Sequence, residues 1–332
     1  MSSNVFLQAI NLGLLWSVMA IGVFITFRIL NFADLTVEGS FVTGAAVVAS
    51  TITMGINPMI GTLLAIVAGI LAGLVTGFFH TVLKIPPLLS GILTMTGLFS
   101  INLRIMAIGS PQRSLANISL GRGVTTIMNQ AAELFSNILT TISSWFGRTE
   151  AVTVSTRDAS IVIGLVAVIV VIFILKWFFN TELGYALRAT GDNEPMIKAQ
   201  GVNTNRMKML GLATGNACVA LSGALVSQAQ GFADVNMGVG TIVTGLAAVI
   251  IGEVFFRDKN NSRVFIAVVF GAVLFFIIRA LVLAWEGMDA NDFRLFTAVM
   301  IAFALSLPMF RDKFNVNFKK LFLGGNSKGG GE

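Results

Sequence analysis

The sequence predicts an all-α, polytopic membrane protein, a bundle of about nine transmembrane helices with a range of about eight to ten. Hydrophobic residues make up 55% of the 332 residues and charged residues 11%, whereas soluble domains carry about 25% charged residues. Apolar runs of about 20 residues, long enough to cross a hydrocarbon core of roughly 30 Å, recur along the chain. The net charge of +6 is thinly spread, which argues against nucleic-acid binding. The single cysteine excludes a disulfide scaffold.

These apolar runs set the expected spans. The first run lacks a preceding basic segment and a small-residue cleavage site, so we expect a span there and not a cleaved signal. Polar residues interrupt the second and the seventh runs. The expected spans cover about residues 5–27, 29–50, 58–83, 88–108, 159–179, 209–230, 236–256, 263–285 and 291–310.

The distribution of lysine and arginine predicts the orientation. Basic residues gather in 180–208, 257–263 and 311–320, whereas the connector 286–292 is acidic. Because cytoplasmic loops carry the excess of lysine and arginine, the three basic segments belong inside the cell. With nine spans the N-terminus then lies outside and the C-terminus lies in the cytoplasm. We expect one transmembrane domain over 1–310 in the plasma or inner membrane, followed by a flexible Gly-rich tail over 311–332.

Residues 110–158 form the one long segment expected on the outer side. Within it, apolar residues recur at helical spacing between Ile127 and Phe146, and polar residues fill much of the remainder. This pattern predicts an amphipathic helix on the outer membrane surface or against the bundle. The helix could serve as a docking surface or an outer gate, or it could simply pack.

An internal repeat is indicated by two similar segments about 200 residues apart. Asn31-Phe32-Ala33-Asp34-Leu35 is matched by Gly231-Phe232-Ala233-Asp234-Val235, and Val42-Thr43-Gly44 by Val243-Thr244-Gly245. In the predicted orientation the first copy enters the membrane from inside and the second from outside. That is the arrangement of an inverted repeat, and transport sites commonly lie between such repeats. The expected halves are residues 29–179 and 236–310.

Each copy carries acidic or amide groups beside glycine in a sequence otherwise suited to lipid. An ionised side chain in hydrocarbon costs at least about 2.5 kcal/mol, so these segments should face protein or water, as broken helices lining a cavity do. Alternatively, Asp34 and Asp234 could cap the N-termini of helices. The translocation-pathway candidates are Asn31, Asp34, Glu38, Asp234 and Asn236.

Glycines at intervals of four residues predict close helix packing. Gly69, Gly73 and Gly77 form such a stripe in the third span, and Gly211 and Gly215 repeat the spacing in the sixth. Small residues at this spacing let helix backbones approach each other, so a packing role is expected for all five.

Catalytic motifs do not occur in the sequence. A phosphate-binding Gly-x-x-x-x-Gly-Lys-Ser/Thr loop is missing, and Gly324-Gly325-Asn326-Ser327-Lys328 resembles one in composition only. One histidine, His80, and one cysteine, Cys218, do not make a zinc site of the usual kind or a nucleophile pair. We therefore expect a transport protein that is not an enzyme and that holds no cofactor or metal.

The expected cytoplasmic loop over 180–208 contains a short helix. Asp192 is a good N-cap, Pro195 is tolerated in a first turn, and Gly201 is a good stop. A helix of about two turns is too short to be stable without a partner, so the alternative is a solvated loop.

This loop, from Leu183 to Val202, resembles the coupling segment of permeases in the branched-chain amino acid and ribose family of ABC importers. The segment from Asn31 to Gly39 is similar to the Asn-Phe-Ala-rich early segment of the same family, and the likeness covers roughly 10–308. The resemblance implies a homodimer or a pair of permeases, two ATPase subunits that bind ATP, and an extracytoplasmic substrate-binding protein. In such families a small-residue helix ending in glycine docks into a groove of the ATPase. Its implied counterparts here are Asp192, Asn193, Glu194, Pro195, Met196, Ile197, Ala199 and Gly201.

The sequence from Phe32 to Gly39 most resembles a branch of this family that takes up amino acids, including aromatic amino acids. The segment 110–158 is longer than expected for the family.

The main alternative is a secondary transporter driven by an ion gradient, which would use Asp34, Glu38 or Asp234 as proton or sodium ligands. A channel or a purely structural membrane protein is a third class. Adjacent genes for an ATPase and a binding protein would favour the importer.

Overall fold

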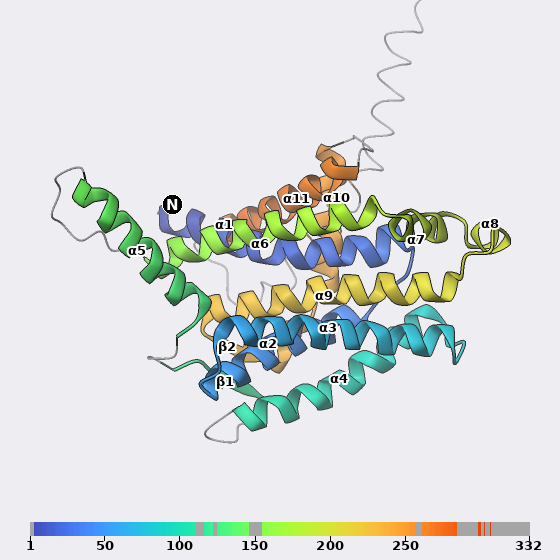
Figure 1. The fold of residues 1–332 in the computed structure, drawn as a ribbon, viewed down its shortest axis with the longest axis horizontal. Coiled ribbons are helices and arrows are strands. Elements are labelled where there is room, and N and C mark those ends of the chain that lie inside the picture. The colour runs from blue at the N-terminus through green and yellow to red at the C-terminus, as the bar shows by residue number, and fades with distance from the viewer. Residues whose placement is uncertain are drawn as a thin grey trace, which may run out of the picture.

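The computed structural model describes residues 3–109, 116–121, 125–145, 155–256 and 261–283, together with residues 298, 299, 302 and 306. The described part is a helix bundle, as predicted (Figure 1). The long helices are α1 (Ser3–Val23), α2 (Thr36–Thr53), α3 (Pro58–Thr81), α4 (Pro87–Gly109), α5 (Ile127–Trp145), α6 (Thr156–Phe179), α9 (Thr204–Gln230), α10 (Thr241–Phe255) and α11 (Asn261–Leu283).

Shorter elements connect or extend these helices. Helix α1 continues as a π-helical turn, η1 (Phe24–Ile29), and α10 is preceded by a 3₁₀ turn, η2 (Val235–Gly238). The strands β1 (Asn117–Ser119) and β2 (Phe232–Asp234) pair antiparallel, with Ile118 opposite Ala233. Helices α7 (Glu182–Asp192) and α8 (Glu194–Ala199) lie at the opposite end of the bundle from the two strands (Figure 1).

Seven helical segments in the described part are long and apolar enough to cross a membrane. They correspond to the first, third, fourth, fifth, sixth, seventh and eighth predicted spans. The predicted ninth span, the acidic connector 286–292 and the tail 311–332 lie outside the described residues, apart from the isolated positions 298, 299, 302 and 306 in the ninth span. The count of nine spans therefore stays approximate.

The second predicted span, 29–50, was placed wrongly at its start. Helix α2 begins at Thr36, and residues 30–35 form a non-helical connection in which Asn31 has a positive φ of 54°. The polar groups in this stretch bond the backbone locally, which competes with a continuous helix. The resulting helix has only 18 residues, and most of its side chains are buried in the protein.

The core lies where α9 packs against α1, α2 and α3. Backbones of α2 and α9 touch directly, because a side chain at Gly44 would collide with the carbonyl of Ala220 and one at Gly223 with the carbonyl of Phe41. The predicted stripe of Gly69, Gly73 and Gly77 faces α9 over its whole length. Small residues thus bring three helices to close contact, as expected inside a membrane.

Helix α5 covers the residues that were predicted to form an amphipathic helix. It packs on α6 and extends away from the bundle at the end where the two strands lie (Figure 1). Its first turn is anchored, because the amide of Ile127 donates to the side-chain oxygen of Gln228 at 3.0 Å.

Candidate translocation site

The two similar segments of the sequence share two local features of the backbone. Asn31 and Gly231, which occupy equivalent positions, both have positive φ angles, of 54° and 78°. Asp34 Oδ1 accepts a hydrogen bond from the amide of Thr36 at 2.9 Å, and Asp234 Oδ1 accepts one from the amide of Asn236 at 2.7 Å. Each aspartate therefore caps the turn that leads into the next helix, which is the capping alternative raised from the sequence.

Asp34 belongs to a buried polar network between α2 and α9. Its side chain is 1% exposed, and Oδ2 accepts a hydrogen bond from Asn216 Nδ2 at 2.7 Å. Asn216 Oδ1 in turn accepts one from Ser40 Oγ at 2.6 Å. The network continues through the hydroxyls of Thr36 and Thr76, which lie 2.6 Å apart. Since every group has a partner, the network fixes these helices and leaves Asp34 enclosed by protein.

Glu38, one turn further along α2, points instead toward the second copy of the repeat. Its Oε1 accepts a hydrogen bond from the amide of Gly240 at 3.0 Å, at the N-terminus of α10. A carboxyl group is favourable at a helix N-terminus because the helix dipole is positive there. Gly240 has a φ of 80°, so the chain turns sharply and α10 starts level with Glu38.

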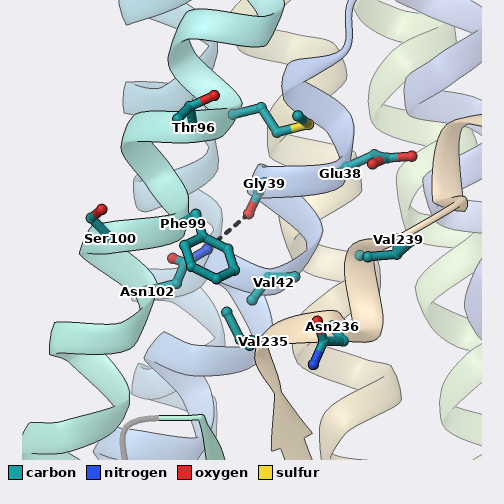
Figure 2. A pocket seen from close by; sticks show the side chains of 12 residues that line it. Glu38, Gly39, Val42, Thr96, Phe99, Ser100, Asn102, Val235, Asn236 and Val239 are labelled. Atoms are coloured by element: carbon teal, nitrogen blue, oxygen red, sulfur yellow. Dashed lines mark hydrogen bonds between the residues drawn. The ribbon is translucent and has the colours of Figure 1, made fainter.

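A pocket of about 300 Å³ opens beside Glu38, between α2, α4 and η2 (Figure 2). Thr96, Phe99 and Ser100 contribute to it from near the middle of the 23-residue helix α4, and Val235 and Asn236 contribute from η2. The pocket therefore lies at about the middle of a membrane-spanning helix. A mid-span position between repeated segments is where transport sites are commonly found.

Asn102 also lines the pocket, and its side chain is 1% exposed. Its Nδ2 donates to the carbonyl of Gly39 at 3.2 Å, drawn as the dashed line in Figure 2. Among the described residues, Oδ1 of Asn102 has no hydrogen-bond donor. Buried acceptors are nearly always paired, so this atom marks a place where a donor is missing.

The structure separates the five predicted pathway candidates. Glu38 and Asn236 come together in the pocket, although they are almost 200 positions apart in the sequence. Asp34 is enclosed in its own network, Asp234 is half-buried and caps η2, and Asn31 is exposed in the connection before α2. Sequence reasoning missed Asn102 and Asn216. The signal was available, because both are amides inside predicted spans and an amide in hydrocarbon needs a partner.

The loop over 180–208, which the sequence predicts to be cytoplasmic, contains the short helix expected there, but the N-cap residue of that helix is different. Asp192 is the last residue of α7. The side chain of Asn193 caps α8, because its Oδ1 accepts a hydrogen bond from the amide of Met196 at 3.1 Å. The prediction of Asp192 as N-cap was wrong because α7 continues the chain in helical form up to that residue. Gly201 has a φ of 87°, which is the left-handed conformation expected of a glycine stop.

Helix α8 is attached to the bundle through the side chain of Glu194 and the buried side chain of Ile197. Lys208 Nζ lies 2.7 Å from Glu194 Oε2, and the hydrogen bond from Lys208 is the main reason why the pKa of Glu194 is lowered. Ile197 is buried, whereas Met196 is 50% exposed. The helix therefore presents a small apolar surface outward, together with Pro195 and Ala199, which are exposed.

The only histidine also lies at this end of the bundle. His80 Nδ1 lies 2.9 Å from the carbonyl of Ile85, so it carries the proton, because a carbonyl only accepts. Its Nε2 lies 3.4 Å from Lys208 Nζ. Both ring nitrogens of His80 therefore have a polar neighbour. Within the described residues, groups of three or more His, Cys, Asp or Glu side chains that could hold a metal ion do not occur.

Comparison with known proteins agrees with this architecture. Residues 5–305 match the model of a family described as "Branched-chain amino acid transport system / permease component". The chain is 38% identical over 309 residues to a tyrosine transport system permease protein of Clostridioides difficile, covering 92% of this chain and 91% of the relative. It is 24% identical over 239 residues to the ribose import permease protein of Escherichia coli, covering 71% of this chain and 65% of that protein. The chain therefore belongs to the branched-chain amino acid transport permease family, the membrane-spanning permease components of ABC importers.

Proposed function

We propose that this chain forms the translocation pathway for an amino acid, and that the pocket beside Glu38 is part of that pathway. The observation that carries the proposal is a pocket near the middle of a span, largely apolar with a few polar groups, next to the N-terminus of helix α10. The relative described as a tyrosine transport permease supports an amino acid as the solute. Ion-gradient-driven transport has no support among the relatives, and the carboxyl groups of Asp34, Glu38 and Asp234 all accept backbone amides.

A second permease copy would complete the pathway. Helix α4 exposes Thr96, Ser100 and Arg104, which follow one another at intervals of four residues and so share one face. Polar groups on a spanning helix are costly against lipid, so this face is better suited to another subunit or to water. We propose that it faces a second copy of the chain, with the pocket near the junction.

An ATPase subunit would bind at α8. The exposed side chains of Met196 and Ala199 offer a small apolar surface, and Gly201 ends the helix in a left-handed turn. The helix is attached to the bundle through Glu194 and Lys208, so movement of an attached ATPase would be passed to α9. The orientation follows from the same proposal: α8 is cytoplasmic, and α5 and the two strands face an extracytoplasmic substrate-binding protein.

The coupling role is tested with Ala199→Trp and Gly201→Val, with Lys198→Ala as the matched control. Lys198 is exposed on the same short helix and is not required for an apolar contact. Both bulky changes should leave membrane insertion intact, weaken copurification of the ATPase and abolish ATP-driven uptake in proteoliposomes. The control should retain both properties. Normal assembly and uptake in both bulky variants would remove α8 from the mechanism and favour an ion-driven transporter.

The pathway role is tested by thiol labelling. Glu38→Cys should react with a water-soluble thiol reagent, because Glu38 lines an open pocket. Asp34→Cys should stay unreactive, because Asp34 is enclosed by protein. If Glu38→Cys reacts only with lipid-soluble reagents, the pocket faces lipid and does not belong to a pathway.

The proposed orientation is tested by inserting a tag near residue 148. A tag that is accessible only from the cytoplasm would overturn this orientation.

A further inference from the structure

The pocket beside Glu38 has a composition that selects among solutes. Apolar side chains make up most of its wall: Val42, Met95, Phe99, Val235 and Val239. Its volume of about 300 Å³ is at the lower end for small-molecule sites, which run from about 300 Å³ upward. An apolar wall of this size with a few polar groups suits one amino acid with a large side chain.

Two of its polar groups are incompletely bonded. Among the described residues, the carboxyl group of Glu38 receives one hydrogen bond, from Gly240 to Oε1, and Oε2 receives none. Oδ1 of Asn102 receives none although it is buried. Both groups only need donors: an ionised carboxylate accepts through both oxygens, and Asn102 already uses Nδ2 on Gly39.

The two groups come from different walls of the pocket. Glu38 belongs to α2 and points toward α10, whereas Asn102 belongs to α4, with the Phe99 ring of the same helix drawn near it (Figure 2). A solute with a cationic donor at one end, an aromatic body and a neutral donor at the other end would satisfy both. Cationic donors to carboxylates make the stronger hydrogen bonds.

We infer that this pocket binds an aromatic amino acid that carries a side-chain donor, with the α-ammonium group on Glu38 and a phenol or indole donor on Asn102 Oδ1. The inference rests on the proposed function and adds to it a specificity that belongs to the permease itself. The solute carboxylate lies toward the opening, where the exposed side-chain amide of Asn236 offers donors. The apolar wall contacts the ring.

The test uses the purified full-length permease without its partners, so that a binding protein does not set the result. Ser100→Cys is the reporter, because Ser100 is exposed at the pocket, and the native Cys218 is buried and gives the background rate. Tyrosine should slow the reaction of this cysteine with a water-soluble methanethiosulfonate. Desaminotyrosine, which lacks the ammonium group, and phenylalanine, which lacks the phenol, should each need about tenfold more for equal protection, as expected for one lost hydrogen bond.

Variants assign the two contacts. Glu38→Gln keeps an acceptor for Gly240 and removes the charge, so protection by tyrosine should fall about tenfold while desaminotyrosine is unaffected. Asn102→Leu removes the acceptor, so tyrosine and phenylalanine should become equal. Glu182→Gln, the same substitution at an exposed position of α7, is the matched control and should change nothing. Thr96→Cys is a second reporter in case the first perturbs the pocket.

Other outcomes overturn the inference. Equal protection by tyrosine and desaminotyrosine, or protection that survives Glu38→Gln, removes Glu38 from recognition. An unreactive Ser100→Cys that forms a disulfide-linked dimer under oxidation shows that a second copy fills the pocket. ATP-driven tyrosine uptake by the complete importer separates the two claims. Uptake without protection overturns the inference and leaves the proposed function standing, whereas failure of uptake counts against the proposed function itself.

Discussion

Replacing Asn216 by leucine should destabilise the permease more than any other single amide substitution in its core. Asn216 is fully buried on α9, where it donates to Asp34 Oδ2 at 2.7 Å and accepts from Ser40 Oγ at 2.6 Å. Leucine is of similar size but makes neither bond. The substitution therefore leaves one carboxyl oxygen and one hydroxyl without partners between α2 and α9, in a region closed to water.

The expected cost follows from these two groups. An unpaired buried neutral group costs about 1–3 kcal/mol, and a hydrogen bond to a charged group contributes about 1.5–3 kcal/mol. Ser40 can turn its hydroxyl toward a carbonyl of its own helix, so the carboxyl group dominates. We expect a loss of about 3 kcal/mol, or about 6 °C in the unfolding midpoint at roughly 2 °C per kcal/mol.

The chain carries its own reporter for this measurement. Cys218, the only cysteine, is 8% exposed and lies two residues beyond Asn216 on α9. A thiol-reactive dye that fluoresces on conjugation therefore reads the loss of this core on heating in detergent. Because such unfolding is commonly irreversible, the midpoints must be compared at one heating rate.

A second substitution decides whether the buried carboxyl group causes the loss. Asp34→Asn preserves the shape and the oxygen that caps Thr36, but it removes the charge that Asn216 stabilises. Added to Asn216→Leu, it should recover about 2 kcal/mol, since a neutral amide is less costly to leave unpaired. A double variant that melts no higher than Asn216→Leu alone would refute this reasoning and assign the loss to packing.

Two further predictions concern a helix contact and a titration. Gly44→Leu should lower the same midpoint strongly, because its side chain meets the Ala220 carbonyl; Gly97→Leu, on an open face of α4, should not, and an equal effect would contradict the packing. The pKa of Glu194 is lowered from its ordinary value of 4.5. The hydrogen bond from Lys208 therefore stabilises α8 fully above that pH, and this stabilisation is lost as the pH falls through the lowered pKa. Corrected hydrogen exchange of α8 should therefore rise on acidification, and a similar rise in Glu194→Gln would exclude this residue as the cause.

The bundle was predictable because apolar length is a strong signal in a membrane protein. Seven predicted spans correspond to helices, and the amphipathic helix over 127–146 corresponds to α5. The start of α2 was not predictable from hydropathy. Phe32 and Leu35 are apolar enough for lipid, and only the positive φ of Asn31 and the cap by Asp34 interrupt the helix.

The sequence predicted polar residues of the site, but it did not predict what surrounds each of them. The cost of polar groups in hydrocarbon identified both Asp34 and Glu38, but it does not say whether protein or an open pocket surrounds each one. That outcome depends on Asn216, which lies 182 positions beyond Asp34 and supplies its partner. A pairing at such a distance requires the packing of α2 on α9, which a single sequence does not contain.

Helix α10 is fastened at both of its ends to residues from the beginning of the chain. At its N-terminus the amide of Gly240 is bound by Glu38, and near its C-terminus Glu253 pairs with Arg28 Nε at 2.8 Å. Two attachments fix the tilt of a rod as well as its position, so α10 follows any rotation of α2 and η1. If the bond to Glu38 breaks, α10 stays attached through Arg28 alone and can rotate about that end. Helix α11 would move with α10, because the two helices pack along each other.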